Sequence, residues 1–446
     1  MSTGLQRDDE LGAALRELEV PEHAPGFHAA LRRRLEAERR DHLAAVRRTR
    51  VRWGLRVAAV AAVAAIVLVA VGIPRTERTP SIAGPEVATA GQVKAKVRTA
   101  LAEMRNLGGV LVYDGPAQGD EQRWRFAMTA RGDFRLDGPS EGEAIAYDSA
   151  AGLVRSAQRS ASLGGETVFY AERRGVAPGP PDGGPPTWIL PKELGSYVRA
   201  LLAAEDARVR QTVHEGRAAW RVEVDVVPNA VVPEFSGDRF EITVDRATGV
   251  PVRVVEQRRG EFLRELRIVS LAVDSRLPAA AFRLDFPPGA EVMRSDDGFR
   301  RVQLHEAESV VGYAPLVPAW VPEGYELADV AVAAEGGPTG TEAGNPPSRN
   351  VVSLSFRRGF DQFLVTTRLA DAGGEWDDPL ATGEGFVDEP EHATIGGGAL
   401  AGETAELVLV PRGIPHLWAL ADRLVVTLGG DLSRAELLRV TESLRR

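Results

Sequence analysis

Residues that could do acid–base, metal or nucleophilic chemistry are scattered along this sequence. The seven histidines show no spacing typical of metal ligands: His23, His28, His42, His214, His305, His392 and His416. Two pairs of adjacent acids, Asp296-Asp297 and Asp377-Asp378, lie in polar, turn-like stretches. They could bind a hard cation, but adjacent acids in loops are more often simply solvated. Gly396-Gly397-Gly398 is typical of a turn before a strand.

The sequence also lacks the short motifs that carry known chemistries. It contains no GxxxxGK[ST], GxSxG or HExxH, and no GxGxxG followed by a helix. The absence of cysteine excludes thiol catalysis and every zinc site that needs cysteine ligands. We therefore predict that the chain is not an enzyme and that it binds no cofactor and no metal.

Charge is distributed unevenly along the 446 residues. The formal net charge is −9, but residues 1–56 hold 12 arginines and 9 acids, a balance of +3, which leaves −12 for the remainder. An acidic remainder argues against nucleic acid as a ligand, because phosphate binding needs clustered Lys and Arg. The length leaves room for two or three domains, which without cysteine must be stabilised by packed cores instead of disulfides.

One stretch, residues 57–73 (VAAVAAVAAIVLVAVGI), contains no charged or hydrogen-bonding side chain. As a helix it would be about 25 Å long, slightly short of the hydrocarbon core of a bilayer at about 30 Å. Trp53 and Arg56 at one interface, with Arg75 at the other, extend it to a transmembrane helix at 53–73. An alanine-rich core helix is the alternative. A cleaved signal peptide is disfavoured, because more than fifty residues precede the stretch.

The basic residues around the predicted span set its orientation. Seven arginines lie close before it: Arg39, Arg40, Arg47, Arg48, Arg50, Arg52 and Arg56. Because basic residues are retained in the cytoplasm, we predict a single-pass protein of the cell membrane. Residues 1–52 then form a cytoplasmic helical tail, and everything after Ile73 is outside. The tail could be a protein-binding module or a basic helix lying on anionic lipid.

A linker at 74–88 leads to a predicted β domain at 89–292, which begins with a helix near 90–107. Its strands alternate apolar and charged residues, which places the apolar side chains on one face of an antiparallel sheet and leaves the other face solvated. Pro251 suggests that its own strand lies at an edge. Five apolar residues are candidates for the lining of a lipid cavity, with ordinary core as the alternative: Trp124, Phe126, Met128, Val222 and Val224.

Two features interrupt these strands. Residues 175–186 (GVAPGPPDGGPP) have the composition of an irregular loop, and residues 188–204 are predicted to form an amphipathic helix. The loop and the helix could form a lid over a hydrophobic cavity, or the helix could simply seal the core. The sequence leaves both interpretations open.

Residues 293–312 are predicted to link this domain to a small α+β domain at 313–446. Alternating residues indicate a hairpin that turns at Arg358-Gly359, and 424–428 is a final strand. Ser433 and Glu436 have the spacing of a capping box, which predicts a last helix through Leu444.

Four stretches of the first domain form a series: Glu215–Val224, Phe240–Arg259 (FEITVDRATGVPVRVVEQRR), Leu277–Phe282 and Phe286–Gly289. The second domain adds Trp320–Tyr325 (WVPEGY) and Val425–Gly429 (VVTLG), followed by the capped helix. The first series resembles the superfamily of lipoprotein carriers and sigma-E regulators that includes LolA, LppX and RseB/MucB. The second is similar to the smaller C-terminal domain of RseB/MucB, and the order of the two domains also matches. The resemblance covers about residues 90–446.

The resemblance implies a half-open antiparallel barrel with helices, of the LolA type, followed by the small α+β domain. With the predicted transmembrane helix, the expected fold class is mainly β with α+β parts. The resemblance also implies an apolar cavity that holds acyl chains or lipoprotein termini, and an anti-sigma or sigma factor as a protein partner. The expected partners are therefore lipid or lipoprotein, such a factor, and the membrane, but no nucleic acid.

The chain departs from these regulators in one respect, because they are free periplasmic proteins and this chain has a predicted span and tail. Zinc-binding anti-sigma factors carry paired cysteines in such a tail, and this tail has none. We predict a membrane-anchored sensor or regulator of envelope stress. The alternative is a lipid or lipoprotein carrier that is tethered to the membrane.

Overall fold

The computed structural model describes residues 88–115, 121–140, 142–162, 165–175, 192–204, 206–226, 236–296, 298–333, 350–369, 390–410 and 413–446. All of them belong to one unit, residues 85–446. The predicted tail, the predicted span with Trp53, Arg56 and Arg75, and nearly all of the predicted linker lie outside the described residues. Within the described ranges, no helix has the length and apolar character needed to cross a bilayer.

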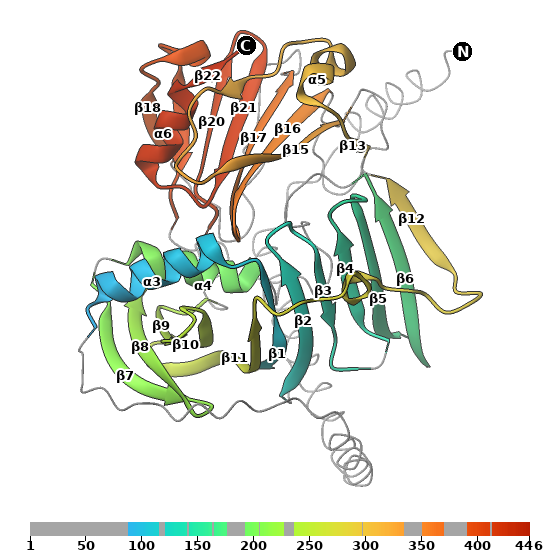
Figure 1. The fold of residues 1–446 in the computed structure, drawn as a ribbon, viewed down its shortest axis with the longest axis vertical. Helices are drawn as coiled ribbons and strands as arrows, with labels where there is room; N and C mark the ends of the chain where they lie inside the picture. The colour runs from blue at the N-terminus through green and yellow to red at the C-terminus, as the bar shows by residue number, and fades with distance from the viewer. Residues whose placement is uncertain are drawn as a thin grey trace, which may run out of the picture. The chain divides into compact units, whose positions relative to one another are not determined.

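The first sheet has twelve strands, and neighbouring strands are antiparallel except for the pair at one edge, β12 and β6 (Figure 1). In sheet order the strands are β12 (Val292–Asp296), β6 (Gly165–Arg174), β5 (Leu153–Ser162), β4 (Ala144–Asp148), β3 (Phe134–Asp137), β2 (Gln122–Thr129), β1 (Asn106–Asp114), β11 (Glu261–Val273), β10 (Pro251–Arg258), β9 (Arg239–Asp245), β8 (Arg217–Asp225) and β7 (Arg208–His214). The predicted antiparallel sheet in a mainly β chain is therefore confirmed.

Two helices cover one side of this sheet, which we call the inner face (Figure 1). They are α3 (Ala90–Glu103) and α4 (Lys192–Ala203). The alternation predicted from the sequence holds along β2, where Trp124 and Phe126 are buried and Arg123 and Arg125 are exposed. Period two therefore separates an apolar inner face from a charged outer face here.

A tight turn between β9 and β10 provides a seat for α3. Asp245 is buried, and its carboxylate accepts hydrogen bonds from the backbone N–H and hydroxyl of Thr248, both at 2.8 Å, and from Arg217. Gly249 closes the turn at φ +77°, and a Cβ there would lie 2.8 Å from the carbonyl oxygen of Lys96 in α3. The DRATG sequence thus builds a turn against which a helix backbone packs directly.

Two expectations about the helices and strands of the first domain are wrong. Pro251 does not mark an edge strand, because β10 lies between β9 and β11; it is the first residue of β10, where a missing N–H is tolerated. The first helix does not reach Leu107, which instead pairs with Met128 and Val273 as part of β1. The apolar residues here are spaced three and four apart, a spacing that was compatible with Leu107 in a helix as well as in a strand.

The outer face is also not solvated along its whole length. The closing segment that contains η4 (Ala279–Phe282) packs across β4 and β5, where Leu284 joins a buried cluster with Ala144, Ala146 and Ala157. Period-two patterning does not show that a later segment will cover a sheet made largely of alanine on that side.

The second sheet has eight strands. In sheet order they are β13 (Phe299–Arg301), β15 (Glu326–Ala333), β16 (Val351–Arg358), β17 (Asp361–Leu369), β21 (Leu424–Gly430), β20 (His416–Ala421), β19 (Thr404–Val408) and β18 (Glu391–Thr394). The predicted hairpin is the β16–β17 pair, and the predicted final strand is β21. The short elements around the sheet are α5 (Leu304–Val311), α6 (Arg434–Glu442), η6 (Gly398–Leu400) and the paired strands β14 (Val317–Pro318) and β22 (Leu444–Arg445).

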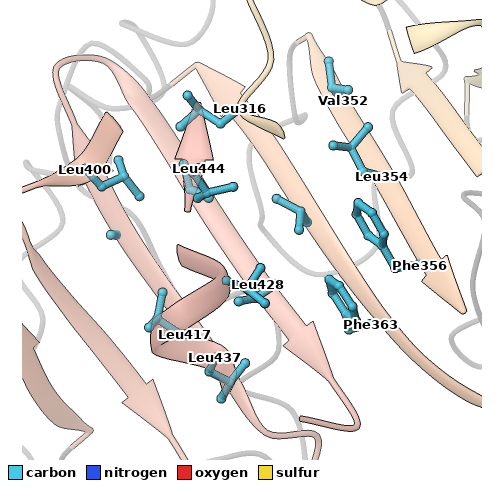
Figure 2. Close-up of a cluster of buried hydrophobic side chains, with 14 of the residues drawn as sticks. Leu316, Val352, Leu354, Phe356, Phe363, Leu400, Leu417, Leu428, Leu437 and Leu444 are labelled. Carbon is cyan, nitrogen blue, oxygen red and sulfur yellow. The ribbon is translucent and has the colours of Figure 1, made fainter. Parts of the chain in front are cut away.

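Helix α6 packs on one face of the second sheet, and Figure 2 shows Leu437 beside Leu417 and Leu428. Its predicted capping box is present: the Ser433 hydroxyl accepts from the Glu436 N–H, and the Glu436 carboxylate accepts from the Ser433 N–H. The helix ends at Glu442, not at Leu444, because Leu444 pairs with Pro318 in β22. Leu444 is nevertheless fully buried, as an apolar residue in that position should be.

The connection between the sheets is itself paired with both of them. β12 extends the first sheet beside β6, and β13 extends the second sheet beside β15. Between them, the N–H of Phe299 donates to the carbonyl of Gly175 at 2.9 Å. The stretch predicted as a linker, 293–312, therefore consists largely of β12, β13 and α5.

We expect Gly249→Ala to destabilise the protein by about 2 kcal/mol more than Gly216→Ala, measured by denaturant unfolding of the full-length chain. Both glycines have φ near +75°, but a Cβ at position 216 would meet nothing within 4 Å, whereas one at 249 would collide with α3. The pair therefore separates backbone strain from the helix contact. Equal losses for the two variants would show that the turn is not a seat for α3.

Candidate binding site on the inner face of the first sheet

One hydrophobic cluster lies between the two helices and strands β8 to β10. Tyr197 of α4 packs edge-on against Phe240 of β9, with ring centroids 4.9 Å apart. The other fully or nearly fully buried members of this helix-side cluster are Val93, Val97, Val198, Ala200, Leu201, Val222, Val224, Ile242, Val244 and Val254. Burying this many apolar side chains is what attaches α3 and α4 to the sheet.

A second cluster continues along the inner face across β1 to β5. Met104, at the end of α3, joins it to the helix. The remaining buried members of this strand-side cluster are Leu107, Leu111, Trp124, Phe126, Phe134, Leu136, Ile145, Tyr147, Val154, Val250, Val252, Leu266 and Ile268. The inner face therefore carries two buried apolar clusters, which together include residues of strands from β8 to β5.

The five predicted cavity residues all lie on this face but are divided between the clusters. Trp124 and Phe126 are buried in the strand-side cluster, with Met128 packed against it, while Val222 and Val224 belong to the helix-side cluster. The structure thus brings them to one surface, as predicted, without joining them in one group. That they line a lipid cavity stays a prediction.

One functional feature of the inner face was missed from the sequence: the carboxylate of Glu256, which is completely buried. It accepts hydrogen bonds from the Tyr197 hydroxyl at 3.0 Å, from Arg264 Nε and from the N–H of Gly237. Tyr197 belongs to α4, so this carboxylate ties the helix to β10 and β11. The sequence contained a signal for this buried acid, because Glu256 follows Val250, Val252 and Val254 at period two and so falls on the same face of the sheet.

Polar atoms without partners also lie in the strand-side cluster. Trp124 Nε1 and Tyr147 Oη are buried and have no hydrogen-bond partner. Burial raises the pKa of Tyr147, so its hydroxyl is neutral and can still donate. Buried donors are nearly always satisfied in folded proteins, so these two atoms are exceptions in the described part of the chain.

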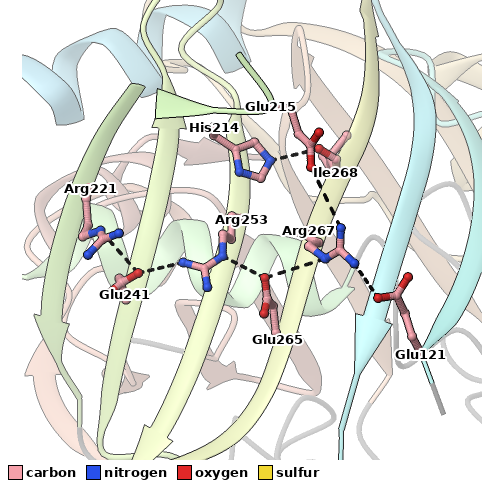
Figure 3. A network of polar contacts seen from close by, with 9 residues as sticks. All are labelled: Glu121, His214, Glu215, Arg221, Glu241, Arg253, Glu265, Arg267 and Ile268. Carbon is pink, nitrogen blue, oxygen red and sulfur yellow. Dashed lines mark hydrogen bonds and ion pairs between the residues drawn. The ribbon is translucent and has the colours of Figure 1, made fainter. Parts of the chain in front are cut away.

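The outer face of the same sheet carries a ladder of alternating charges, which Figure 3 shows from β8 to β11. Neighbouring strands are joined by ion pairs between Arg221 and Glu241 (3.4 Å), Arg253 and Glu241 (2.8 Å), Arg253 and Glu265 (2.7 Å), and Arg267 and Glu265 (3.9 Å). Burial lowers the pKa of Arg253, but its bonds to Glu265 and Glu241 outweigh this, and the pKa lies above the ordinary value. Each arginine of the ladder therefore has acidic partners, and opposite charges on neighbouring strands stabilise the sheet.

The sheet curls strongly enough to bring distant strands together. His214, at the end of β7, lies with its Nε2 atom 3.1 Å from the carbonyl oxygen of Ile268 in β11, although three strands separate β7 from β11 in the sheet (Figure 3). Glu215 in the following turn also approaches Arg267, at 4.0 Å. The β7 end of the open sheet therefore curls back toward β11.

The scattered residues that could do other chemistry remain scattered in the described part of the chain. There, no three or more His, Asp or Glu side chains gather in a way that could hold a metal ion. Asp296 accepts from the N–H of Gly298, while Asp297, Asp377 and Asp378 lie outside the described residues. Gly398 begins η6 ahead of β19, in agreement with the turn predicted there.

Comparison with known proteins finds similarity to solved structures alone. No family model and no curated protein sequence matches the chain. A crystal structure of MucB is similar over 81% of this chain and 99% of its own, with 15% identity and a TM-score of 0.31. The MucA/MucB complex from Pseudomonas aeruginosa is similar over 80% of this chain and 99% of its own, with 15% identity and a TM-score of 0.27. A LolA superfamily protein from Nitrosomonas europaea is similar over 44% of this chain and 99% of its own, with 10% identity and a TM-score of 0.19. These solved structures carry the same names, MucB and LolA, as the superfamily that the sequence motifs resemble.

We expect Arg264→Met to destabilise the full-length protein by about 3–5 kcal/mol, because it leaves the buried Glu256 carboxylate without its cation. Arg239→Met is the matched control: Arg239 pairs with the exposed Asp225, and its loss should change the unfolding midpoint little. Denaturant unfolding measures both. Similar midpoints for the two variants would mean that Glu256 does not depend on Arg264.

Val224→Asp should unfold the first domain or lower its stability by several kcal/mol, because it buries an unpaired carboxylate in the helix-side cluster. Val213→Asp makes the same change in β7 at a side chain that is 69% exposed, and should be tolerated. Circular dichroism during heating compares the two. If the two variants have the same melting temperature, Val224 is not packed in the helix-side cluster.

Proposed function

We propose that this chain is a membrane-anchored regulator whose two sheet domains act outside the cytoplasm, binding an acyl chain and a protein partner. The observation that carries this is the inner face of the first sheet, an apolar surface under α3 and α4 that ends in buried, unpartnered donors. An acyl chain fits such a surface, and a carboxyl or ester oxygen at its end could accept from Trp124 Nε1 or Tyr147 Oη.

The partner part of the proposal rests on the motifs that resemble RseB/MucB. Those motifs fall on structural elements of both sheets: Asp245–Gly249 seats α3, Trp320–Tyr325 lies beside α6, and Val425–Gly429 is within β21. The predicted span and cytoplasmic tail add a route to the cytoplasm. An anti-sigma or sigma factor is the partner class that this combination favours, with the tail as a second contact.

The alternative is a tethered carrier of lipid or lipoprotein, in which the tail is only an anchor. The contact between α4 and Glu256 favours considering it, because a buried carboxylate is added there to the apolar packing that attaches the helix to the sheet. A carrier must release its cargo, and loss of this polar contact would loosen α4 over the inner face. A regulator needs no such release.

The deciding experiment is an in-cell crosslink of the full-length, tagged protein, followed by pull-down and mass spectrometry of the proteins and lipids recovered. We expect a sigma or anti-sigma factor together with acyl-chain lipid or lipoprotein. A variant lacking residues 1–50 is processed in parallel, and transcripts of envelope-stress genes are measured in both strains.

Each result selects between the two functions. Lipid or lipoprotein without a regulatory protein, and transcripts unchanged by the tail deletion, would establish the carrier and exclude transmembrane signalling. A regulatory protein with no acyl ligand would remove lipid from the proposal. Recovery of neither would overturn both.

A further inference from the structure

The turn between β16 and β17 reaches from the second sheet to the inner face of the first. The N–H of Phe360 in this turn donates to the carbonyl of Leu101, in the last turn of α3, at 2.7 Å, and the Phe360 ring packs against the strand-side cluster. Gly359 has φ +57°, and a Cβ there would lie 2.2 Å from the same carbonyl oxygen, so glycine is required for this close approach. We call this contact the junction of the two sheets.

Arg357, near the end of β16, brings its guanidinium group to the β2–β3 turn of the first sheet. A Cβ on Gly132 in that turn would lie 3.1 Å from Arg357 Nη2 and 3.2 Å from Nη1. The Arg357 side chain is only 9% exposed. Its Nε and Nη2 atoms nevertheless have no hydrogen-bond partner in the part of the chain that the structure describes. A buried guanidinium without hydrogen bonds is costly, and a bound anion would stabilise it.

The acids around Arg357 do not supply these hydrogen bonds. Asp329 Oδ2 lies 3.5 Å from Arg357 Nη2 without accepting a hydrogen bond from it, and Asp329 Oδ1 pairs with Arg301 at 3.0 Å. Asp133 accepts instead from the N–H and the hydroxyl of Ser149, at 2.9 and 2.6 Å. Burial outweighs the attraction of both acids and lowers the pKa of Arg357. Two guanidinium groups therefore share the Asp329 carboxylate, and one of them is buried.

A second buried donor, the Tyr147 hydroxyl, lies at the same end of the strand-side cluster. Tyr147 of β4 pairs with Phe134 of β3, two residues after Gly132. Tyr147 is fully buried, and its Oη atom has no hydrogen-bond partner among the described residues. Tyr147 and Arg357 are close enough for each to influence the pKa of the other. At the β2–β3 turn the apolar cluster thus meets a neutral hydroxyl and a guanidinium from the other sheet.

We propose that the acyl ligand of this protein is a free fatty acid, whose carboxylate binds between Arg357 and Tyr147 while its chain lies along the strand-side cluster. This inference rests on the proposed acyl-binding function and narrows its ligand class. A carboxylate accepts charge-assisted hydrogen bonds from a guanidinium and a further bond from a hydroxyl. An ester or an amide, the form in which lipids and lipoproteins carry acyl chains, offers no charge to the guanidinium. Because Arg357 belongs to the second sheet, the bound acid contacts both sheets.

The test compares radiolabelled palmitic acid with radiolabelled methyl palmitate. Both bind to the full-length chain in phospholipid nanodiscs at about pH 8, where a carboxyl group is ionised, at equal mole fractions in the bilayer. Empty nanodiscs give the background. We expect the acid to bind about tenfold more tightly than the ester, because a hydrogen bond to a charged group contributes more than one to a neutral group.

The outcomes of this comparison distinguish the inference from the function on which it rests. Equal affinities for the two probes, or tighter binding of the ester, would overturn the fatty-acid inference and leave an acyl-binding protein. Binding of neither probe would overturn the acyl function as well.

Variants with opposite expected effects separate ligand binding from folding. Arg357→Gln should abolish the preference for the acid without changing the affinity for the ester, and Tyr147→Phe should reduce the preference severalfold. Asp329→Asn removes the carboxylate that competes for Arg357 and should increase the preference. Arg125→Gln alters a β2 side chain that is 77% exposed, and it should behave as the parent chain.

A purely structural role for Arg357 predicts a different pattern. Arg357→Gln and Asp329→Asn both break the same ion pair, so a loss of packing would change the affinity for both probes in the same direction in the two variants. A preference that survives Arg357→Gln, or that falls in Asp329→Asn, would overturn the site. If Arg357→Gln does not fold, the parent chain together with Tyr147→Phe decides the matter.

Discussion

The packing of α3 is the contact on which the rest of the described structure depends. Its middle is fixed by Val93 and Val97 in the helix-side cluster and by the close approach of Gly249. Its end supplies Met104 to the strand-side cluster and the Leu101 carbonyl to the N–H of Phe360, in the turn between β16 and β17. One helix therefore covers the inner face and also receives the second domain. A displacement of α3 cannot leave the inner face or the junction unchanged.

The second helix is held differently, and this bears on whether it is a lid or part of the core. Tyr197 and Leu201 are buried as core residues would be, but Tyr197 also bonds to the Glu256 carboxylate. A buried ion pair adds little net stability over apolar packing, yet breaking it by removing one partner is costly. Such a contact fixes the position of α4 on the sheet more than it adds to the free energy of unfolding. That favours a helix with a defined seat, which either function can use.

Much of the fold was predictable because it depends on local pattern, and what was missed depends on contacts distant in sequence. The alternation of apolar and charged residues predicted which side chains lie on the inner face. The spacing of Ser433 and Glu436 predicted where α6 begins. Pro251 misled because strand order is not a local property, and the outer face of β4 and β5 is covered by a segment more than a hundred residues later. The predicted cavity residues lie on one face of the sheet, as period two indicated. The roles of Glu256 and Phe360 depend instead on contacts with α4 and α3, which are distant in sequence.

The connection between the sheets limits what kind of motion the junction allows. β12 is paired with β6 of the first sheet and β13 with β15 of the second, so the chain is anchored on both sides within a few residues. Gly298, at φ +80°, lies between them, and the neighbouring Phe299 N–H bonds to Gly175. Two domains joined this tightly cannot separate by a long distance.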